Sequence, residues 1–424
     1  MKSEIKQRIE QINNGQVPDG YKKTEFGVFP CDWVTDKKLA DVGVFGKGKG
    51  LPGDKMVNDG VPCVGYGDIY MKYNHFHFEK AQNFVDEETA KESQPIEKGT
   101  LLFTGTGETA EEIGKCVCYN GNETIYAGGD ILTFNTKTVN PLFLAYQQYQ
   151  PYSLRKKASF GQGHSVVHIQ RENLEKLPIA YPADTKEQEK IAEILMKWDE
   201  AIELQEKYIE KLESQKNSVA RILLSPQQNW NTIPLSKAIK VVGGYAFKSE
   251  KYVINGKYKI ITIANVNQNS FVVDDSTNTI DDLPSDIKDY QQLCVGDIVM
   301  SLTGNVARTC KVNAINCLLN QRVAKIIAKP GFDKDFIYHL LQTYRFIEYM
   351  KMYAQGAAQD NLSVKDIYKF VVKVPSTISE QKSIAKEISV FDANIDKHKQ
   401  KLNYYLQQRK ALQQYLLNGI VRVI

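Results

Sequence analysis

Two long stretches of the chain carry apolar residues at alternating steps of four and three. In the first stretch these positions are Ile191, Leu195, Trp198, Ile202, Ile209 and Leu212, and in the second they are Ile384, Ile388, Phe391, Ile395, Leu402 and Tyr405. Such spacing is typical of a coiled-coil seam, whereas a helix on a globular surface has a wider apolar stripe and is shorter. The pattern predicts two helices of roughly forty residues, each about 60 Å long, that pack along one another.

Polar residues interrupt both seams at matching places. Gln205 corresponds to His398, and Lys216 corresponds to Arg409. Polar seam residues can fix register and partner choice at some cost in stability. The alternative is that the helices diverge there and these side chains reach solvent, and the sequence alone leaves both interpretations open.

The two helices belong to an internal duplication of the chain. The aligned positions are Gln188 with Gln381 at a shift of 193 residues, and Trp33 with Trp230 and residues 98–107 with 295–304 at a shift of 197. Ordered matches in the same sequence of elements are the signature of a repeat. Each half therefore begins at a tryptophan, continues through a β-rich segment and ends in a long helix.

The segments before the two helices alternate short apolar strands with short helices. Strands are expected at 258–266, 297–302, 322–328 and 370–375, and helices at 140–150 and 334–350. We therefore predict an α+β fold with two pseudo-repeated domains, separated and joined by two long antiparallel coiled-coil helices. The expected parts are an N-terminal helix at 1–20, a first domain at 21–182, a central long helix at 183–226, a second domain at 227–375 and a C-terminal long helix at 376–424.

Composition narrows the class of protein. The 54 basic and 50 acidic residues give a formal charge of +4, which permits a local basic face without requiring one. No apolar run approaches the roughly 18 residues of a membrane span, and the first residues lack the apolar core of a signal peptide. The seven cysteines are irregularly spaced, so we interpret them as reduced thiols of a cytoplasmic protein rather than as a metal site.

Two glycine-rich motifs approach known catalytic loops but lack a required residue. Residues 43–50, GVFGKGKG, place Gly50 where a phosphate-binding loop needs a hydroxyl for the metal, so a basic loop that contacts DNA phosphate or a solvated turn is expected instead. Residues 103–107, FTGTG, match the methyl-donor loop of adenine methyltransferases, but the chain lacks the Pro-Pro of their partner motif, so we expect a strand-to-loop turn. Since the histidines show no metal-ligand spacing, we predict no catalytic residue, metal site or cofactor on this chain.

The order of these features resembles the specificity subunit of type I restriction–modification systems, over nearly the whole chain. Residues 20–33, 229–239 and 296–305 look like the openings and inner strands of its target-recognition domains. Residues 320–326 and 357–367 look like its later recurrent segments, and EQEKIAEIL, EQKSIAKEI and LLNGIVRVI look like its shared helical regions. The first half departs from the pattern at 128–134, where residues 320–326 have no direct counterpart.

The resemblance implies a division of labour between subunits. Each recognition domain would read one half of a split site in double-stranded DNA, and the helical pair would set the spacing and dock two methyltransferase subunits. Those subunits would carry S-adenosylmethionine and flip the target adenine out of the duplex. Restriction motor–nuclease subunits would join them, so the chain itself would be no enzyme and would need no membrane. The sequence also admits a coiled-coil adaptor whose two domains bind ligands other than DNA.

Candidate DNA-contacting residues follow from the chemistry of base reading. Bases are read by Arg, Lys, Asn, Gln, Ser or Thr on loops at a domain edge, and phosphates by cations and amides. The candidates in the first domain are Lys47, Lys49, Thr104, Thr106, Gln162, His164 and Ser165. The candidates in the second domain are Lys248, Asn305, Arg308, Gln355, Gln359 and Asn361. For each of them the alternative is an ordinary solvated loop residue.

Overall fold

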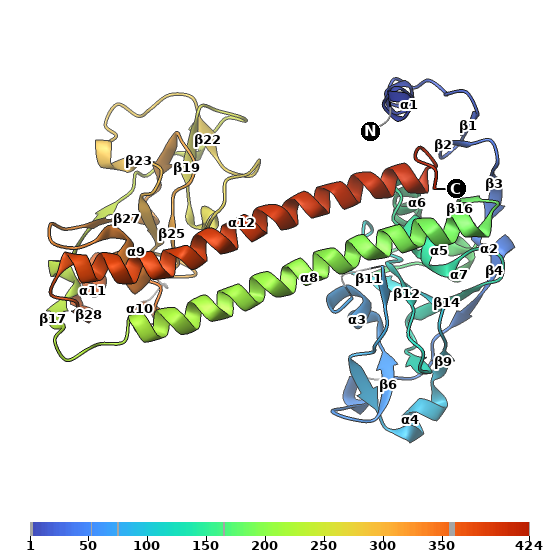
Figure 1. Ribbon diagram of the computed structural model, residues 1–424, viewed down its shortest axis with the longest axis horizontal. Coiled ribbons are helices and arrows are strands. Elements are labelled where there is room, and N and C mark those ends of the chain that lie inside the picture. Colours follow the sequence, from blue (N-terminus) through green and yellow to red (C-terminus); the bar gives the residue numbers. More distant parts are fainter. Residues whose placement is uncertain (1–2, 52, 74–75, 164–165, 356–360, 424) are drawn as a thin grey trace. The chain divides into compact units, whose positions relative to one another are not determined.

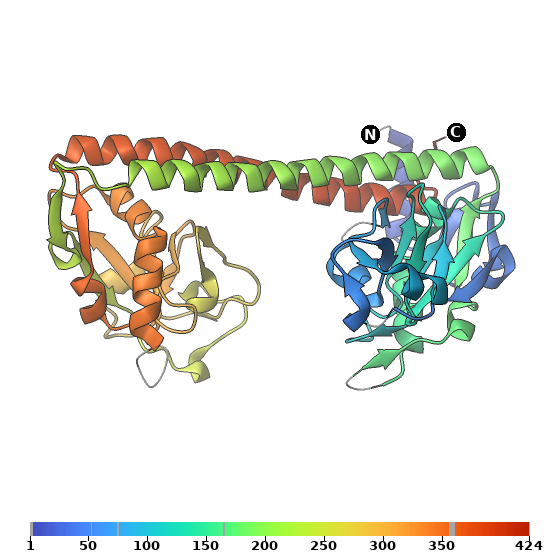
Figure 2. The same ribbon diagram turned by 90° about the horizontal axis from the view of Figure 1, so that it is seen from below.

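The chain folds into two compact units in the computed structural model, which describes residues 3–51, 53–73, 76–163, 166–355 and 361–423. Unit 1 comprises Met1–Glu206 with Lys401–Ile424, and unit 2 comprises Lys207–Gln400. Both long helices, green and red in Figure 1, contribute residues to each unit. Within each unit the strands lie to one side of its section of the paired helices (Figure 2).

The described strands of unit 1 form two five-stranded sheets, ordered β4-β14-β10-β12-β7 and β5-β8-β6-β13-β9, and the pairs β1-β2, β11-β15 and β16-β3. Its strands are β1 Tyr21–Thr24, β2 Gly27–Pro30, β3 Trp33–Lys38, β4 Gly43–Lys47, β5 Met56–Val57, β6 Val61–Val64, β7 His77–Phe78, β8 Asn83–Val85, β9 Gln94–Ile96, β10 Leu101–Thr104, β11 Thr106–Gly107, β12 Cys116–Tyr119, β13 Ile125–Ala127, β14 Ile131–Thr136, β15 Val167–His168 and β16 Pro178–Pro182. Its helices are α1 Ser3–Asn13, α2 Leu39–Val42, η1 Gly53–Lys55, α3 Tyr66–Met71, α4 Glu87–Glu92, α5 Pro141–Gln147, α6 Pro151–Phe160, α7 Arg171–Leu174 and the start of α8 Thr185–Leu223.

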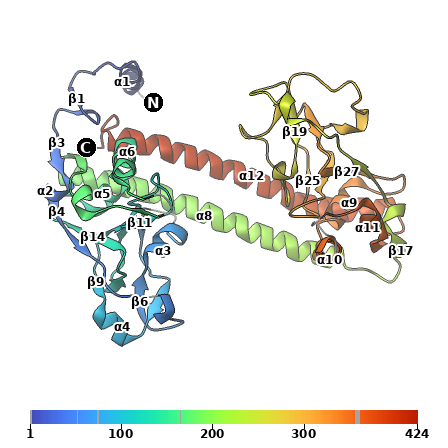
Figure 3. The same cartoon turned by 180° about the vertical axis from the view of Figure 1, so that it is seen from behind.

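The central strand of unit 1, β10, is buried on both faces. Phe103 points into a cluster that joins α5, α8 and the end of α12, whereas Leu102 points into a second cluster shared with the other large sheet. A strand that is covered on both sides reads as a continuous apolar run, as Leu101–Thr104 does. Figure 3 shows α5 and α6 beside the C-terminal end of α12, where Leu416 and Leu417 complete the first cluster.

Unit 2 repeats this plan with smaller sheets. Among its described residues the sheets are ordered β18-β27-β24-β25 and β22-β19-β26-β23, with the pairs β17-β28 and β20-β21. Its strands are β17 Asn231–Pro234, β18 Ile239–Gly243, β19 Tyr258–Ile261, β20 Val266–Asn267, β21 Ser270–Phe271, β22 Thr279–Ile280, β23 Gln292–Leu293, β24 Ile298–Ser301, β25 Thr309–Lys311, β26 Cys317–Leu319, β27 Val323–Ala328 and β28 Val371–Val374. Its helices are η2 Leu235–Lys237, η3 Ser249–Lys251, η4 Ile263–Asn265, η5 Asp289–Gln291, α9 Lys334–Leu340, α10 Tyr344–Gln355, α11 Val364–Lys369 and most of α12 Ile378–Leu417.

The predicted fold class is confirmed: both units are mixed α+β, and two long helices run antiparallel. In unit 2, Lys399 pairs with Glu213 and Asp392 pairs with Lys216, so residue numbers rise along one helix as they fall along the other. The predicted seam residues that are buried are Ile191, Leu195, Ile202, Ile209, Leu212, Ile384, Ile388 and Ile395, and those that are half-buried are Trp198, Phe391, Leu402 and Tyr405. In unit 1 the rings of Trp198 and Tyr405 meet edge to face, with centroids 5.7 Å apart.

Two expected elements of unit 2 are interrupted by side chains that bond to the backbone. The strand expected at 258–266 ends at Ile261, because Asn265 accepts hydrogen bonds from the amide and the hydroxyl of Thr262 and closes a 3-10 turn. The helix expected at 334–350 breaks into α9 and α10, because Thr343 accepts from the Phe346 amide and caps a new helix. Short polar side chains compete in this way with regular structure.

The FTGTG stretch differs from the expected turn. Thr104 ends β10, and Thr106–Gly107 form a further short strand, β11, that pairs with β15. None of the described helices combines the length and apolarity that crossing a membrane would require.

Candidate nucleic-acid interface

The duplicated glutamines Gln188 and Gln381 fasten each β-rich domain to its long helix. Gln188 accepts a hydrogen bond from the Asn140 amide over 2.7 Å and donates to the Pro182 carbonyl over 2.7 Å. In unit 2, Gln381 accepts from the Asp333 amide over 2.9 Å and donates to the Pro375 carbonyl over 3.2 Å. Both side chains are buried, so each glutamine serves inside its own unit rather than at the surface.

Charge pairs lie beside these anchors in the helical seam, buried in unit 1 and partly exposed at Asp392 in unit 2. In unit 1, Arg409 donates to Asp199 over 2.9 Å, and Asp199 also accepts from the Tyr146 hydroxyl over 2.7 Å. In unit 2, Lys216 lies 2.5 Å from Asp392, and the ring of His339 packs against the same carboxylate. Tyr146 and His339 belong to α5 and α9, so each pair joins a domain to both long helices. Lys216 and Arg409 are therefore buried and paired, which excludes the solvent-exposed interpretation for these two residues.

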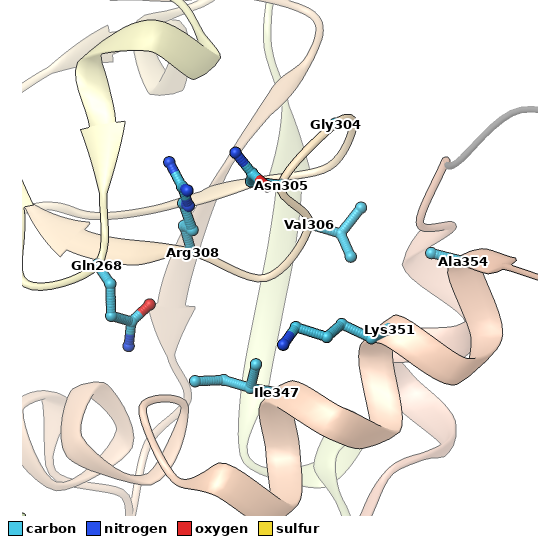
Figure 4. A pocket seen from close by; sticks show the side chains of 8 residues that line it. All are labelled: Gln268, Gly304, Asn305, Val306, Arg308, Ile347, Lys351 and Ala354. Atoms are coloured by element: carbon cyan, nitrogen blue, oxygen red, sulfur yellow. The ribbon is translucent and has the colours of Figure 1, made fainter. Parts of the chain in front are cut away.

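In unit 2 the loop between β24 and β25 lines a pocket of about 390 Å³. Of the sequence candidates, Asn305 and Arg308 lie in this pocket, with Asn305 exposed and Arg308 half-buried. Figure 4 shows Gln268 from β20–β21 and Lys351 from α10 facing the same space. Amide and cationic groups thus converge from three parts of the fold, which is the chemistry that base edges and phosphates require.

In unit 1 a comparable pocket of about 370 Å³ lies where β4, β11 and β15 meet. Lys47 and Thr106 line it, and the Thr106 hydroxyl is 3.1 Å from His168 Nδ1. Acidic groups, Asp130 and Glu172, line it as well. This pocket is therefore more mixed in charge than the pocket in unit 2.

Thr104 does not belong with the surface candidates. Its side chain is completely buried, and its hydroxyl shares a hydrogen bond of 2.7 Å with Tyr70. The Tyr70 hydroxyl also donates towards the carbonyls of Thr106 and Glu112, over 3.2 and 3.3 Å, and so closes the loop between them. Thr104 therefore stabilises this loop through Tyr70 and does not belong to the proposed interface.

The other candidates are spread over both units. Lys49, Gln162, Lys248 and Asn361 are exposed. His164, Ser165 and Gln359, and the side chain of Gln355, lie outside the described residues. In unit 2, Thr303 forms an antiparallel β-bridge with Asn361. In unit 1, Thr106 of β11 pairs in the same way with His168 of β15, so the repeat brings equivalent positions together.

Several polar residues of the two pockets were missed by sequence reasoning. They are Gln268 and Lys351 in unit 2, and His168, Gln170 and Arg171 in unit 1. The repeat could have indicated His168, because the 193-residue shift places it on the candidate Asn361. Nothing in the sequence indicates that α10 brings Lys351 against the loop of Arg308.

The described residues contain no group of three or more His, Cys, Asp or Glu side chains arranged to hold a metal ion. All seven cysteines are free, and five of them are buried. Burial raises the pKa of Cys116 to about 12 and that of Cys317 to about 11, so these thiols stay protonated at neutral pH.

A sequence profile described as the type I restriction modification DNA specificity domain matches this chain twice, over residues 30–214 and 227–404. The chain belongs to this family. The type I restriction enzyme MjaVIII specificity subunit of Methanocaldococcus jannaschii is 25% identical over 355 residues, which cover 77% of this chain and 80% of that protein. The type I restriction enzyme EcoBI specificity subunit of Escherichia coli is 26% identical over 202 residues, covering 47% of this chain and 40% of that protein.

Solved structures from type I restriction–modification systems share the fold. The type I restriction–modification S subunit from M. genitalium aligns with a TM-score of 0.61 at 16% identity, covering 91% of this chain and 96% of that one. A chain from a study of complex assembly and conformational transition of the type I system aligns with a TM-score of 0.51 at 11% identity, covering 96% and 100%. At such low identities these likenesses concern the fold alone.

Proposed function

We propose that this chain is the DNA-specificity subunit of a type I restriction–modification complex, in which each unit reads one half of a bipartite site. The observation that carries this proposal is the double match of the specificity-domain profile to one chain. The duplicated anchors Gln188 and Gln381 support it, because each domain is attached to its helix by the same hydrogen bonds.

The family works with DNA and with the modification and restriction subunits of the type I complex, and it is not itself catalytic. In our proposal two methyltransferase subunits dock on the long helices and bring S-adenosylmethionine to the site. The target adenine must leave the base stack, since its amino group lies inside the duplex. This chain supplies the DNA sequence specificity, and its long helices set the distance between the two half-sites.

Reading takes place at the loops that line the two pockets. The polar groups of Asn305, Arg308, Lys351 and Gln268 suit base edges and phosphates in unit 2. In unit 1 the cations Lys47 and Arg171 lie beside the acidic Asp130 and Glu172, so the two units are expected to prefer different half-sites. The adaptor alternative has no support from the family or from the fold.

Binding of the complex reconstituted with its modification subunits tests the proposal. We expect two protected half-sites separated by an unprotected gap, and an affinity that falls steeply as salt rises, because phosphate contacts release counterions. One continuous footprint would contradict reading by two domains. Salt-independent binding or no binding would contradict a role in DNA recognition.

A further inference from the structure

The loop between β24 and β25 holds the backbone of Arg308 in one conformation. The buried Ser301 hydroxyl donates to the Asn305 carbonyl over 2.6 Å and accepts from the Arg308 amide over 3.1 Å. Ala307 adopts a left-handed conformation with φ of 62°, and its amide donates to the Ser301 carbonyl over 3.0 Å. Because Thr309 also pairs with Met300, the loop is tied to β24 on both sides of Arg308.

The guanidinium of Arg308 is also oriented. Its Nη1 donates to Asn267 Oδ1 over 3.0 Å, and no ion pair found among the described residues involves it. Figure 4 shows the nitrogen ends of Arg308 and Asn305 pointing to the same side. A guanidinium has five N–H donors in a fixed plane, so the bond to Asn267 leaves a two-donor edge for a ligand.

We propose that Arg308 recognises a guanine in the half-site bound by unit 2; this inference rests on the proposed function. Two N–H groups of the guanidinium would donate hydrogen bonds to the O6 and N7 atoms of that guanine in the major groove. Arginine with guanine is the commonest specific contact because the two donors match the two acceptors. A phosphate contact needs charge alone, whereas the fixed loop and Asn267 restrict the plane of the guanidinium. Asn267 is accordingly a positioning residue.

The first domain lacks this feature. The structural equivalent of Arg308 in the first domain is Lys115, because the Thr104 amide donates to the Lys115 carbonyl over 3.0 Å as the Ser301 amide donates to the Arg308 carbonyl over 3.0 Å. The Lys115 ammonium donates to the Tyr70 carbonyl over 3.3 Å and lacks the planar two-donor edge of a guanidinium. The guanine requirement set by this loop position therefore belongs to one half-site only.

Arg308→Lys in the assembled modification complex tests the proposal, because lysine keeps the positive charge but lacks the planar pair of N–H donors. Sequencing of methylated adenines should show one guanine position of one half-site accepting other bases, with discrimination reduced roughly 5- to 100-fold. Asn267→Ala should relax the same position more weakly. Continued recognition of the other half-site shows that the variant complex is folded. Arg345→Lys is the control substitution and should leave the motif unchanged, because Arg345 is exposed and lies over the Phe370 ring.

Two results would overturn the proposal. One is an unchanged motif for both Arg308→Lys and Arg308→Ala. The other is equal weakening of all sequences by Arg308→Ala with Arg308→Lys behaving as wild type, which identifies a phosphate contact. If the wild-type complex itself produces no bipartite motif, the proposed function fails instead, so the two failures are distinguishable.

Discussion

Arg409 on α12 donates a hydrogen bond of 2.9 Å to Asp199 on α8, and both side chains are buried within unit 1. The same relationship recurs 193 residues along the chain with the helices exchanged, where Lys216 on α8 lies 2.5 Å from Asp392 on α12 within unit 2. One duplicated pair of positions thus supplies an ion pair to each unit, buried in unit 1 and partly exposed at Asp392 in unit 2. A helix of the attached domain contacts each pair.

Replacing one partner of the unit 1 pair should destabilise the protein strongly. Arg409→Met leaves the Asp199 carboxylate buried without its cation, and we expect a loss of about 3–5 kcal/mol in the free energy of unfolding. The double variant Asp199→Asn with Arg409→Met removes both charges and keeps an acceptor for the Tyr146 hydroxyl, so it should recover most of that loss. Urea unfolding measures both, and an equal loss in the single and double variants would contradict a charge effect.

The glutamine anchors predict a matched pair of local effects. Gln188→Ala removes the partners of the Asn140 amide and the Pro182 carbonyl, and we expect a cost of roughly 2–4 kcal/mol. Hydrogen exchange should become faster at Asn140 in Gln188→Ala and at Asp333 in Gln381→Ala. Each variant is the control for the other, and exchange that increases equally in both units would argue against two separate anchors.

Buried His339 should make stability depend on pH. Burial lowers its pKa to about 4, below its usual value of 6.5, so the folded protein binds fewer protons there than the unfolded chain. The resulting stability is present above pH 6.5 and is lost as the pH falls towards about 4, by on the order of 3 kcal/mol. His339→Gln should remove that part of the pH dependence. Ser389→Ala, which deletes only the hydrogen-bond partner of His339, should retain it.

Gly419 is required where the chain leaves α12. It has φ of +64°, and a Cβ there would lie 2.5 Å from Pro30 Cγ. Gly419→Ala should cost more than the roughly 1 kcal/mol expected for a left-handed alanine alone. The matched control is Gly331→Ala, with φ of +90° and nothing within 4 Å. Equal losses of thermal stability in the two variants would show that the contact with Pro30 is unimportant.

The helices predict how the half-site gap can be changed. Seven residues inserted after Gln205 in α8, matched by seven after Lys401 in α12, preserve the heptad and lengthen each helix by about 10 Å. The gap in the methylated motif should grow by about three base pairs, while both half-sites stay the same. An insertion in α8 alone breaks the register and should abolish methylation. A doubly inserted variant with the original gap would contradict the helices as the spacer.

Periodicity predicted the parts of the fold that are long and repeated, because a seam such as Ile191–Leu195 and its copy Ile384–Ile388 must be apolar at fixed spacing. It did not predict where single polar side chains interrupt elements, as Thr343 does, since capping depends on local geometry. Residue type alone places Thr104 among the candidate DNA contacts, and only the fold shows that it is buried and hydrogen-bonded to Tyr70. Lys351 was missed because its place beside Arg308 arises from tertiary packing.

Sequencing of methylated adenines in a host with and without this gene, with the modification subunit present in both, tests the central claim most directly. Our account predicts that the gene adds one motif made of two short half-sites around a gap of fixed length and unspecified sequence. An identical methylation pattern with and without the gene, or a single uninterrupted motif, would contradict it.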